Sequence, residues 1–283
     1  MMELFKYPFF QKAIFSCFFA GIGCGIVGVW VLLMRISFIG VAISHAAFSG
    51  ALLALLLQKP IVPFSFLFSF AASGILGPLS DRGQLHPDTS LGIIFSTTLG
   101  LAFLFMGVLP GAKSEALNLL WGSILTLDIS DILLLSLTVF LILIIIFLFF
   151  KEIQSVIFNR TLAKASGIPA TFFFYLLLFV SGAVIVSCLK SIGGLLVFSL
   201  IINPSASAYQ ITYNLKKMYI LSSLFGVISG WTGLFISSIL NIPTGASIVL
   251  VSAFIFILSH IFSPKRWTEE KNFSMKLLKG GID

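Results

Sequence analysis

The sequence predicts an all-α, polytopic integral membrane protein with about nine transmembrane helices, and two observations predict this class. Charged residues make up 10% of the 283 residues and hydrophobic residues 58%, whereas a soluble domain carries about a quarter charged residues. Nine stretches contain no Asp, Glu, Lys or Arg, and each is about as long as a helix needs to cross a roughly 30 Å hydrocarbon layer. Backbone polar groups without water have to pair within their own segment, which requires helix. The stretches are 13–34, 38–57, 61–79, 91–110, 132–150, 171–189, 192–213, 218–240 and 243–262.

The first stretch is 22 residues long and lacks a small-residue cleavage site, so we expect a retained helix rather than a signal peptide. Segment 111–130 is ambiguous, because its apolar part from Ala116 to Leu127 is too short to span. A re-entrant or interfacial helix with Trp121 at the headgroup level fits this segment. The number of crossings is therefore eight to ten, and nine fits the charges best.

Basic residues set the predicted orientation. With the N-terminus outside and nine crossings, twelve of the 17 Lys and Arg residues lie inside and five outside, as the positive-inside rule requires. The net charge of +7 therefore reflects membrane topology, and we expect no nucleic-acid partner. The inside residues are Arg35, Arg82, Lys151, Arg160, Lys164, Lys216, Lys217, Lys265, Arg266, Lys271, Lys276 and Lys279.

The chain is expected to form one transmembrane domain over 1–262, followed by a basic inner tail over 263–283. Segment 151–170 is the one substantial internal polar stretch. It predicts a short amphipathic helix that Gly167 ends as a C-cap and that Pro169 prevents from continuing. Composition leaves two interpretations open, a plain basic loop or a docking helix for a soluble partner.

Glycines recur at the same spacing in two predicted helices. This small-xxx-small pattern lets helix backbones approach closely in lipid. An inverted repeat would produce such a recurrence, but chance is the favoured explanation in a chain with 24 glycines. The glycines are Gly21, Gly25 and Gly28 in the first helix and Gly226, Gly230 and Gly233 in the eighth.

His45 is the only histidine well inside a predicted span. An ionisable group at that depth indicates a functional site. On a helix, Ser37, Val41, His45 and Ser49 share one face at i, i+4 spacing, and Ser44 lies beside them. A histidine that bonds to a neighbouring helix and meets no ligand is an equally good interpretation.

A second polar cluster interrupts the seventh apolar stretch at Asn203 and Pro204. Proline leaves backbone carbonyls without their helical hydrogen bonds. Asn203, Ser205 and Ser207 can donate hydrogen bonds to these carbonyls, or they can line a pathway. A packing kink is the slightly favoured interpretation.

Several kinds of chemistry are missing from the sequence. It contains no phosphate-binding GxxxxGK[ST] loop, no HExxH or GxSxG motif, and no chain of intramembrane acids. Cys17, Cys24 and Cys188 lie in apolar spans and are expected to act as small hydrophobic residues. The chain is therefore expected to be no enzyme, and any uphill transport would draw its energy from another subunit.

Four stretches in order resemble the permease subunits of bacterial ABC importers for zinc, manganese and iron. The resemblance covers residues 7–262. The first stretch leads to SHA at 44–46, where the family has G-D-x-x-S-H-A, and the second combines SLGIIFSTTLGLAF with LLWGSIL. The third is FNRTLAKASGI at 158–168, similar to the family's coupling helix F-D-x-x-x-A-x-x-x-G. The last comprises SIGGLLVFSLIINPSASA and LNIPTGASIVL.

The resemblance implies a multi-pass permease of the bacterial cytoplasmic membrane. Two such chains, identical or not, would enclose a pathway, each docked on a cytoplasmic ATPase and supplied by an extracytoplasmic metal-binding protein. It implies a transported divalent metal ion and no permanently bound cofactor. His45 would contact the metal, with Ser37, Ser44, Ser49, Asn203 and Ser205 as candidates to line the pathway. The ATPase-coupling residues would be Phe158, Asn159, Arg160, Ala163 and Gly167.

Three positions depart from the family pattern, which has aspartate where this chain has Val41, Asn159 and Asn241. Val41 matters most, because the family's Asp and His together contact the metal, and a divalent cation gains charge compensation from carboxylate. Three interpretations follow: a transient site assisted by Ser37, Ser49 and a partner chain, a carboxylate from a second permease, or lost metal transport. A metal chelate is the alternative cargo. A self-sufficient secondary transporter and a structural scaffold are less favoured.

Overall fold

The computed structural model describes residues 7–81, 87–109, 119, 122, 127–189 and 191–265. Within these ranges the chain forms helices joined by turns and holds no strand, which confirms the predicted all-α class. The helices are α1 (Pro8–Leu33), α2 (Ile39–Leu56), α3 (Ile61–Asp81), α4 (Pro87–Val108), α6 (Ile129–Leu148), α7 (Phe150–Phe158), α8 (Arg160–Ala165), α9 (Ala170–Cys188), α10 (Gly194–Ile211), α11 (Leu215–Leu240) and α12 (Thr244–Ile261).

In the described part of the chain, eight helices are long and apolar enough to cross a membrane. The predicted seventh crossing is α10, whose 18 residues extend about 27 Å at 1.5 Å per residue. Its apolar part is the shorter run Leu196–Ile211. Together these helices confirm the prediction of about nine crossings. Most of segment 111–130, with Trp121, lies outside the described residues, as do His86 and residues 266–283.

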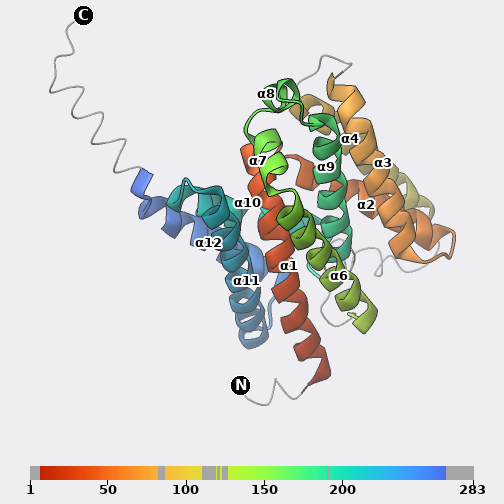
Figure 1. Cartoon of the computed structure of the whole chain (residues 1–283). Helices are drawn as coiled ribbons and strands as arrows, with labels where there is room; N and C mark the ends of the chain where they lie inside the picture. The colour runs from red at the N-terminus through yellow and green to blue at the C-terminus, as the bar shows by residue number, and fades with distance from the viewer. Residues whose placement is uncertain are drawn as a thin grey trace, which may run out of the picture.

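Helix α1 lies in the middle of the bundle and packs against α6, α9, α10 and α11 (Figure 1). It begins at Pro8, more than a turn before the charge-free stretch, because proline is well suited to the first position of a helix. Lys12 therefore lies within α1, where its Nζ donates a hydrogen bond to the carbonyl of Leu127 at 3.2 Å.

Four of the six recurrent glycines lie where α1 and α11 meet, while Gly28 faces α10 and Gly233 faces α12. A Cβ at Gly21 would overlap the backbone of Val227, and one at Gly25 would overlap that of Ser222. The Ser222 hydroxyl donates to the Gly25 carbonyl at 2.7 Å, and Gly230 faces Cys17. These pairs run in opposite directions along the two helices, so α1 and α11 are antiparallel. Close packing of α1 on α11 therefore accounts for the first two glycines of each set, and contacts with α10 and α12 account for Gly28 and Gly233.

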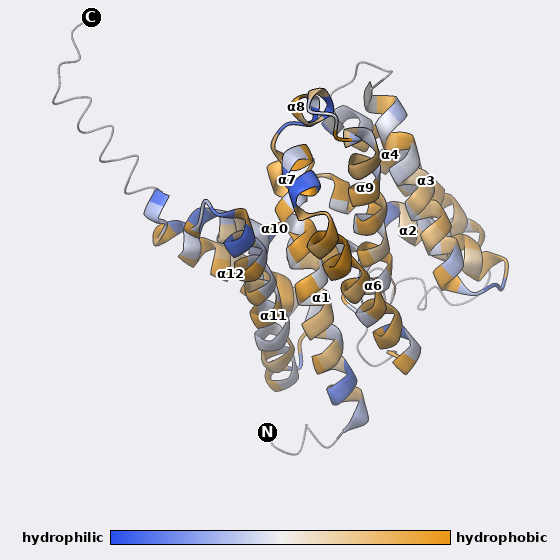
Figure 2. Ribbon diagram, in the orientation of Figure 1, coloured by the Kyte–Doolittle hydropathy of each residue, from blue (hydrophilic) through white to orange (hydrophobic). Residues whose placement is uncertain are grey.

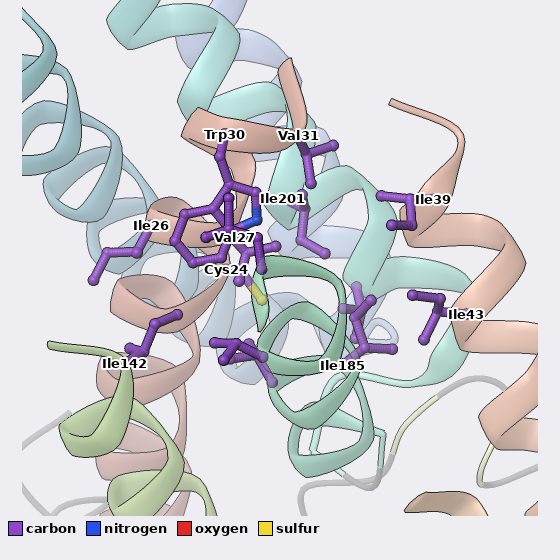
Figure 3. Close-up of a cluster of buried hydrophobic side chains, with 14 of the residues drawn as sticks. Cys24, Ile26, Val27, Trp30, Val31, Ile39, Ile43, Ile142, Ile185 and Ile201 are labelled. Atoms are coloured by element: carbon purple, nitrogen blue, oxygen red, sulfur yellow. The ribbon is translucent and has the colours of Figure 1, made fainter. Parts of the chain in front are cut away.

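The apolar core joins α1 to its neighbours, as Figure 3 shows for Trp30, Ile142, Ile185 and Ile201. The Trp30 indole donates a hydrogen bond to the Ser181 hydroxyl of α9 at 2.9 Å, so its one polar atom is paired. Outside this core the helices remain apolar, and Figure 2 shows hydrophilic residues mainly at the two ends of the bundle. This pattern is typical of a protein whose sides contact lipid.

Segment 151–170 forms two short helices, where one was predicted. The break is at Asn159, whose backbone is extended at φ −161° and ψ 108°. Its side-chain oxygen accepts hydrogen bonds from the N–H groups of Thr161 and Leu162 at 2.9 and 3.0 Å, which caps α8. Gly167 follows the end of α8 with φ +83°, in the role that the sequence predicted.

Candidate functional site

His45 lies midway along α2, a helix that packs against α3, α4, α9 and α10. Its side chain is 7% exposed. The imidazole ring meets the Phe95 ring of α4 edge to face, with 5.0 Å between the ring centroids. No described residue offers a hydrogen bond to Nδ1, although this atom is buried. A buried imidazole nitrogen without a partner is an available ligand.

The serines beside His45 differ in how their hydroxyls are satisfied. The Ser49 hydroxyl donates to the His45 carbonyl at 2.9 Å and also lies against the Thr98 carbonyl of α4. The Ser44 hydroxyl is buried and has no partner among the described residues. Ser44 and the His45 ring therefore supply two unpaired polar atoms at neighbouring positions of α2.

The predicted polar face of α2 does not extend to Ser37. The helix begins at Ile39, so Ser37 lies in the turn that follows α1, outside the i, i+4 series. Val41 is half-buried in the first turn of α2, one turn before His45. The helical part of the face therefore consists of Val41, His45 and Ser49.

The polar side chains next to Pro204 in α10 have hydrogen-bond partners. The Asn203 amide donates to the Ser252 hydroxyl of α12 at 2.9 Å. Ser205 and Ser207 donate to the carbonyls of Ile201 and Asn203, each at 2.8 Å. The helix continues through Pro204, whose missing N–H frees the carbonyl of Leu200 from its usual helical hydrogen bond. Ser205 is also buried where α10 packs on α1.

Sequence reasoning missed a row of serines on α3. Ser65, Ser69 and Ser73 repeat every fourth residue, and all three are buried. The hydroxyls of Ser65 and Ser69 have no partner among the described residues, and Ser69 lies next to Gly182 of α9. Their i, i+4 spacing in an apolar span is a signal that could have found them.

One chain supplies few strong metal ligands. Over the described ranges, no three His, Cys, Asp or Glu residues come together to hold an ion. Cys24 and Cys188 lie with their sulfur atoms 3.8 Å apart inside the apolar core. A cation beside His45 would therefore take its other ligands from hydroxyls, carbonyls, water or a second chain.

The predicted coupling residues lie on or beside α7 and α8 at one end of the bundle (Figure 1). Phe158 is 89% exposed, and the Arg160 guanidinium lies 4.4 Å from the centre of the Phe174 ring. Ala163 is buried. Leu162 is 64% exposed, so this end of the bundle presents two large apolar side chains on its surface.

Comparisons with known proteins agree with this arrangement. The ABC 3 transport family matches residues 6–263. The chain is 31% identical to the manganese transport system membrane protein MntC of Listeria monocytogenes, over 93% of this chain and 94% of that protein. It is 28% identical to a probable iron transport system membrane protein of Haemophilus influenzae, over 94% of each. Among solved structures, PsaBC from Streptococcus pneumoniae in complex with Fab matches with TM-score 0.85 and 33% identity, covering 95% of this chain and 97% of that one.

Proposed function

This chain belongs to the ABC 3 transport family, and from that membership we propose that it imports a divalent transition metal ion, manganese before iron or zinc, through a pathway that His45 contacts. The chain is a multi-pass membrane permease subunit and not itself an ATPase. The observation that carries the proposal is the buried, unpaired Nδ1 of His45. The names of the relatives, which include manganese and iron, support the choice of cargo.

The proposed assembly contains two permease chains in the bacterial cytoplasmic membrane, with a cytoplasmic ATPase on each and an extracytoplasmic binding protein. The segment from Phe158 to Ile168 would receive the ATPase. Exposure of Phe158 and Leu162 supports this role, because aromatic and other apolar side chains form the core of protein interfaces. The charge bias places this segment inside, where an ATPase would meet it.

Val41 leaves the proposed site without a carboxylate. Without a carboxylate beside His45, the pathway would hold a cation weakly and release it easily. The buried Ser44 hydroxyl and the second permease chain are the proposed additional ligands. A neutral metal chelate is the second candidate cargo, because it would need no counter-charge at position 41.

Uptake by the complete transporter tests the proposal. The chain is co-expressed with its ATPase and binding protein in cells without their own manganese importer, and accumulation of radioactive manganese is measured. We expect His45→Ala to abolish uptake while membrane insertion stays normal. His260→Ala is the matched control, because His260 lies at the end of α12 and stacks on Phe256. Normal uptake by His45→Ala would refute the site.

A competition assay separates the two cargoes. If the free ion is the cargo, unlabelled manganese chloride lowers uptake of the label and an added strong chelator stops it. Uptake that continues only when the ion is chelated would favour the chelate.

A further inference from the structure

A pocket of about 930 Å³ opens at the end of the bundle that the charge bias places inside. It lies where α1 and α10 end and α11 begins, with α7 along one side. Three cationic residues line it, and none of its described lining residues is acidic. These cations are Arg35, Lys216 and Lys265. The described lining of the pocket therefore has an excess of positive charge, and the positive-inside prediction puts this end of the bundle on the inner side of the membrane.

Lys265 is the lining cation whose ammonium group lacks a hydrogen-bond partner among the described residues. Its Nζ lies 3.6 Å from the centre of the Tyr209 ring and 4.1 Å from that of Tyr213. This atom is buried and has no hydrogen-bond acceptor among the described residues. Burial lowers the pKa of the ammonium group. Two aromatic faces compensate a cation only in part, so the ammonium is placed to receive an anion.

Lys216 connects this pocket to an apolar hollow. Its Nζ lies over the Phe150 ring at 5.3 Å, and both residues also line a second hollow along the end of α6. Besides Phe150 and Lys216, that hollow is lined by Leu143, Ile146, Phe147 and Leu148, with Lys151 and Glu152 at its polar end. Phe147 is 86% exposed on the side of the bundle. The cationic pocket and a largely apolar hollow therefore meet at Phe150 and Lys216.

We propose that the two hollows together bind one anionic phospholipid of the inner leaflet. The phosphate would lie between Lys265 and Lys216, and an acyl chain would lie along the last two turns of α6. Basic pockets between transmembrane helices on the cytoplasmic side are suited to acidic headgroups. The apolar extension favours a lipid over a free anion or an acidic protein segment, neither of which would fill it. Such a lipid would link α6 and α7 to α10 and α11.

The test measures thermal unfolding of the purified full-length chain in detergent. Dioleoyl phosphatidylglycerol is titrated against dioleoyl phosphatidylcholine, inorganic phosphate and glycerophosphoglycerol, the headgroup without its chains. We expect phosphatidylglycerol alone to raise the unfolding midpoint at low concentration. In Lys216→Gln and Lys265→Gln its half-saturating concentration should rise about fivefold each, equivalent to about 1 kcal/mol per lysine.

The matched control is Lys217→Gln. Lys217 has the same charge, lies next to Lys216 on α11 and is exposed, but does not line either hollow. It should keep the wild-type response, and Lys265→Arg should keep most of it because the charge remains. Lipid that co-purifies with each variant, measured by native mass spectrometry, gives a readout independent of stability.

Other outcomes would overturn the proposal. Equal stabilisation by phosphatidylcholine would exclude recognition of charge, and equal stabilisation by inorganic phosphate or glycerophosphoglycerol would identify a free-anion site. If Lys216→Gln and Lys265→Gln bind lipid normally but no longer co-purify with the ATPase, the pocket is a protein docking surface. None of these measurements depends on metal transport. The lipid site could therefore be correct even if the proposed metal import is wrong.

Discussion

Two polar clusters inside the bundle, one on α2 and one on α10, differ in how their atoms are paired. Asn203 and Ser205 on α10 have hydrogen-bond partners in the chain itself, whereas the ring Nδ1 of His45 and the hydroxyl of Ser44 on α2 have none among the described residues. A paired group in a membrane stabilises packing, while an unpaired one is costly unless a ligand uses it. The difference separates a structural cluster from a candidate transport site.

The largest expected effect concerns His45. In the transport assay, His45→Ala should lower manganese uptake at least about 100-fold, the scale on which removing a ligand or its support affects metal sites. No partner loses a hydrogen bond at Nδ1, but alanine removes the ring contact with Phe95 and leaves a cavity, so the unfolding midpoint should fall only as far as other large-to-small core substitutions lower it. If uptake falls only as much as the amount of folded protein in the membrane, His45 supports packing alone and the contrast between α2 and α10 is lost.

Asn203→Leu should show the opposite behaviour. Leucine removes the hydrogen bond to Ser252, so the free energy of unfolding should fall by about 1 kcal/mol, while uptake stays within a few-fold of wild type. Denaturation in detergent and the same uptake assay measure the two quantities. If uptake is lost and stability is kept, the predicted pathway-lining role of Asn203 is correct and the structural interpretation is wrong.

Val41→Asp tests the counter-charge that this chain lacks. A carboxylate one turn before His45 should strengthen manganese binding by about tenfold, because opposite charges attract strongly where water is scarce. Equilibrium dialysis of the purified complex measures the change, with Val41→Asn as the uncharged control. Unchanged affinity would mean that position 41 does not face the ion.

The smallest expected effect compares two buried serines. Ser44→Ala removes a hydroxyl without a partner and should leave stability unchanged or raise it by up to about 1 kcal/mol, whereas Ser205→Ala should lower it by about 1 kcal/mol. Unfolding measured side by side in the same detergent decides this. A clear loss of stability in Ser44→Ala would reveal a partner for its hydroxyl.

The fold was largely predictable because charge-free stretches of membrane length identify spans without any tertiary information. The packing of α1 on α11 was not predictable, because glycine spacing indicates that a helix packs closely but does not indicate which helix it packs against. The break at Asn159 had a local signal, because asparagine is among the preferred N-cap residues.

The site was predictable only in part. Depth in a span identified His45, but its cover by Phe95 depends on how α4 packs against α2, which no local pattern contains. The serines of α3 were overlooked because their meaning depends on burial against α9. Ser37 was assigned to the helical face because the start of α2 at Ile39 carries no strong capping signal.

Direct ligation of the ion is the central claim. Pulsed electron paramagnetic resonance of manganese(II) bound to the purified permease complex detects coupling to a directly coordinated nitrogen. We predict this coupling in the wild-type chain and in His260→Ala, and its loss in His45→Ala. A nitrogen coupling that persists in His45→Ala, or that is absent from the wild-type chain, would contradict the account.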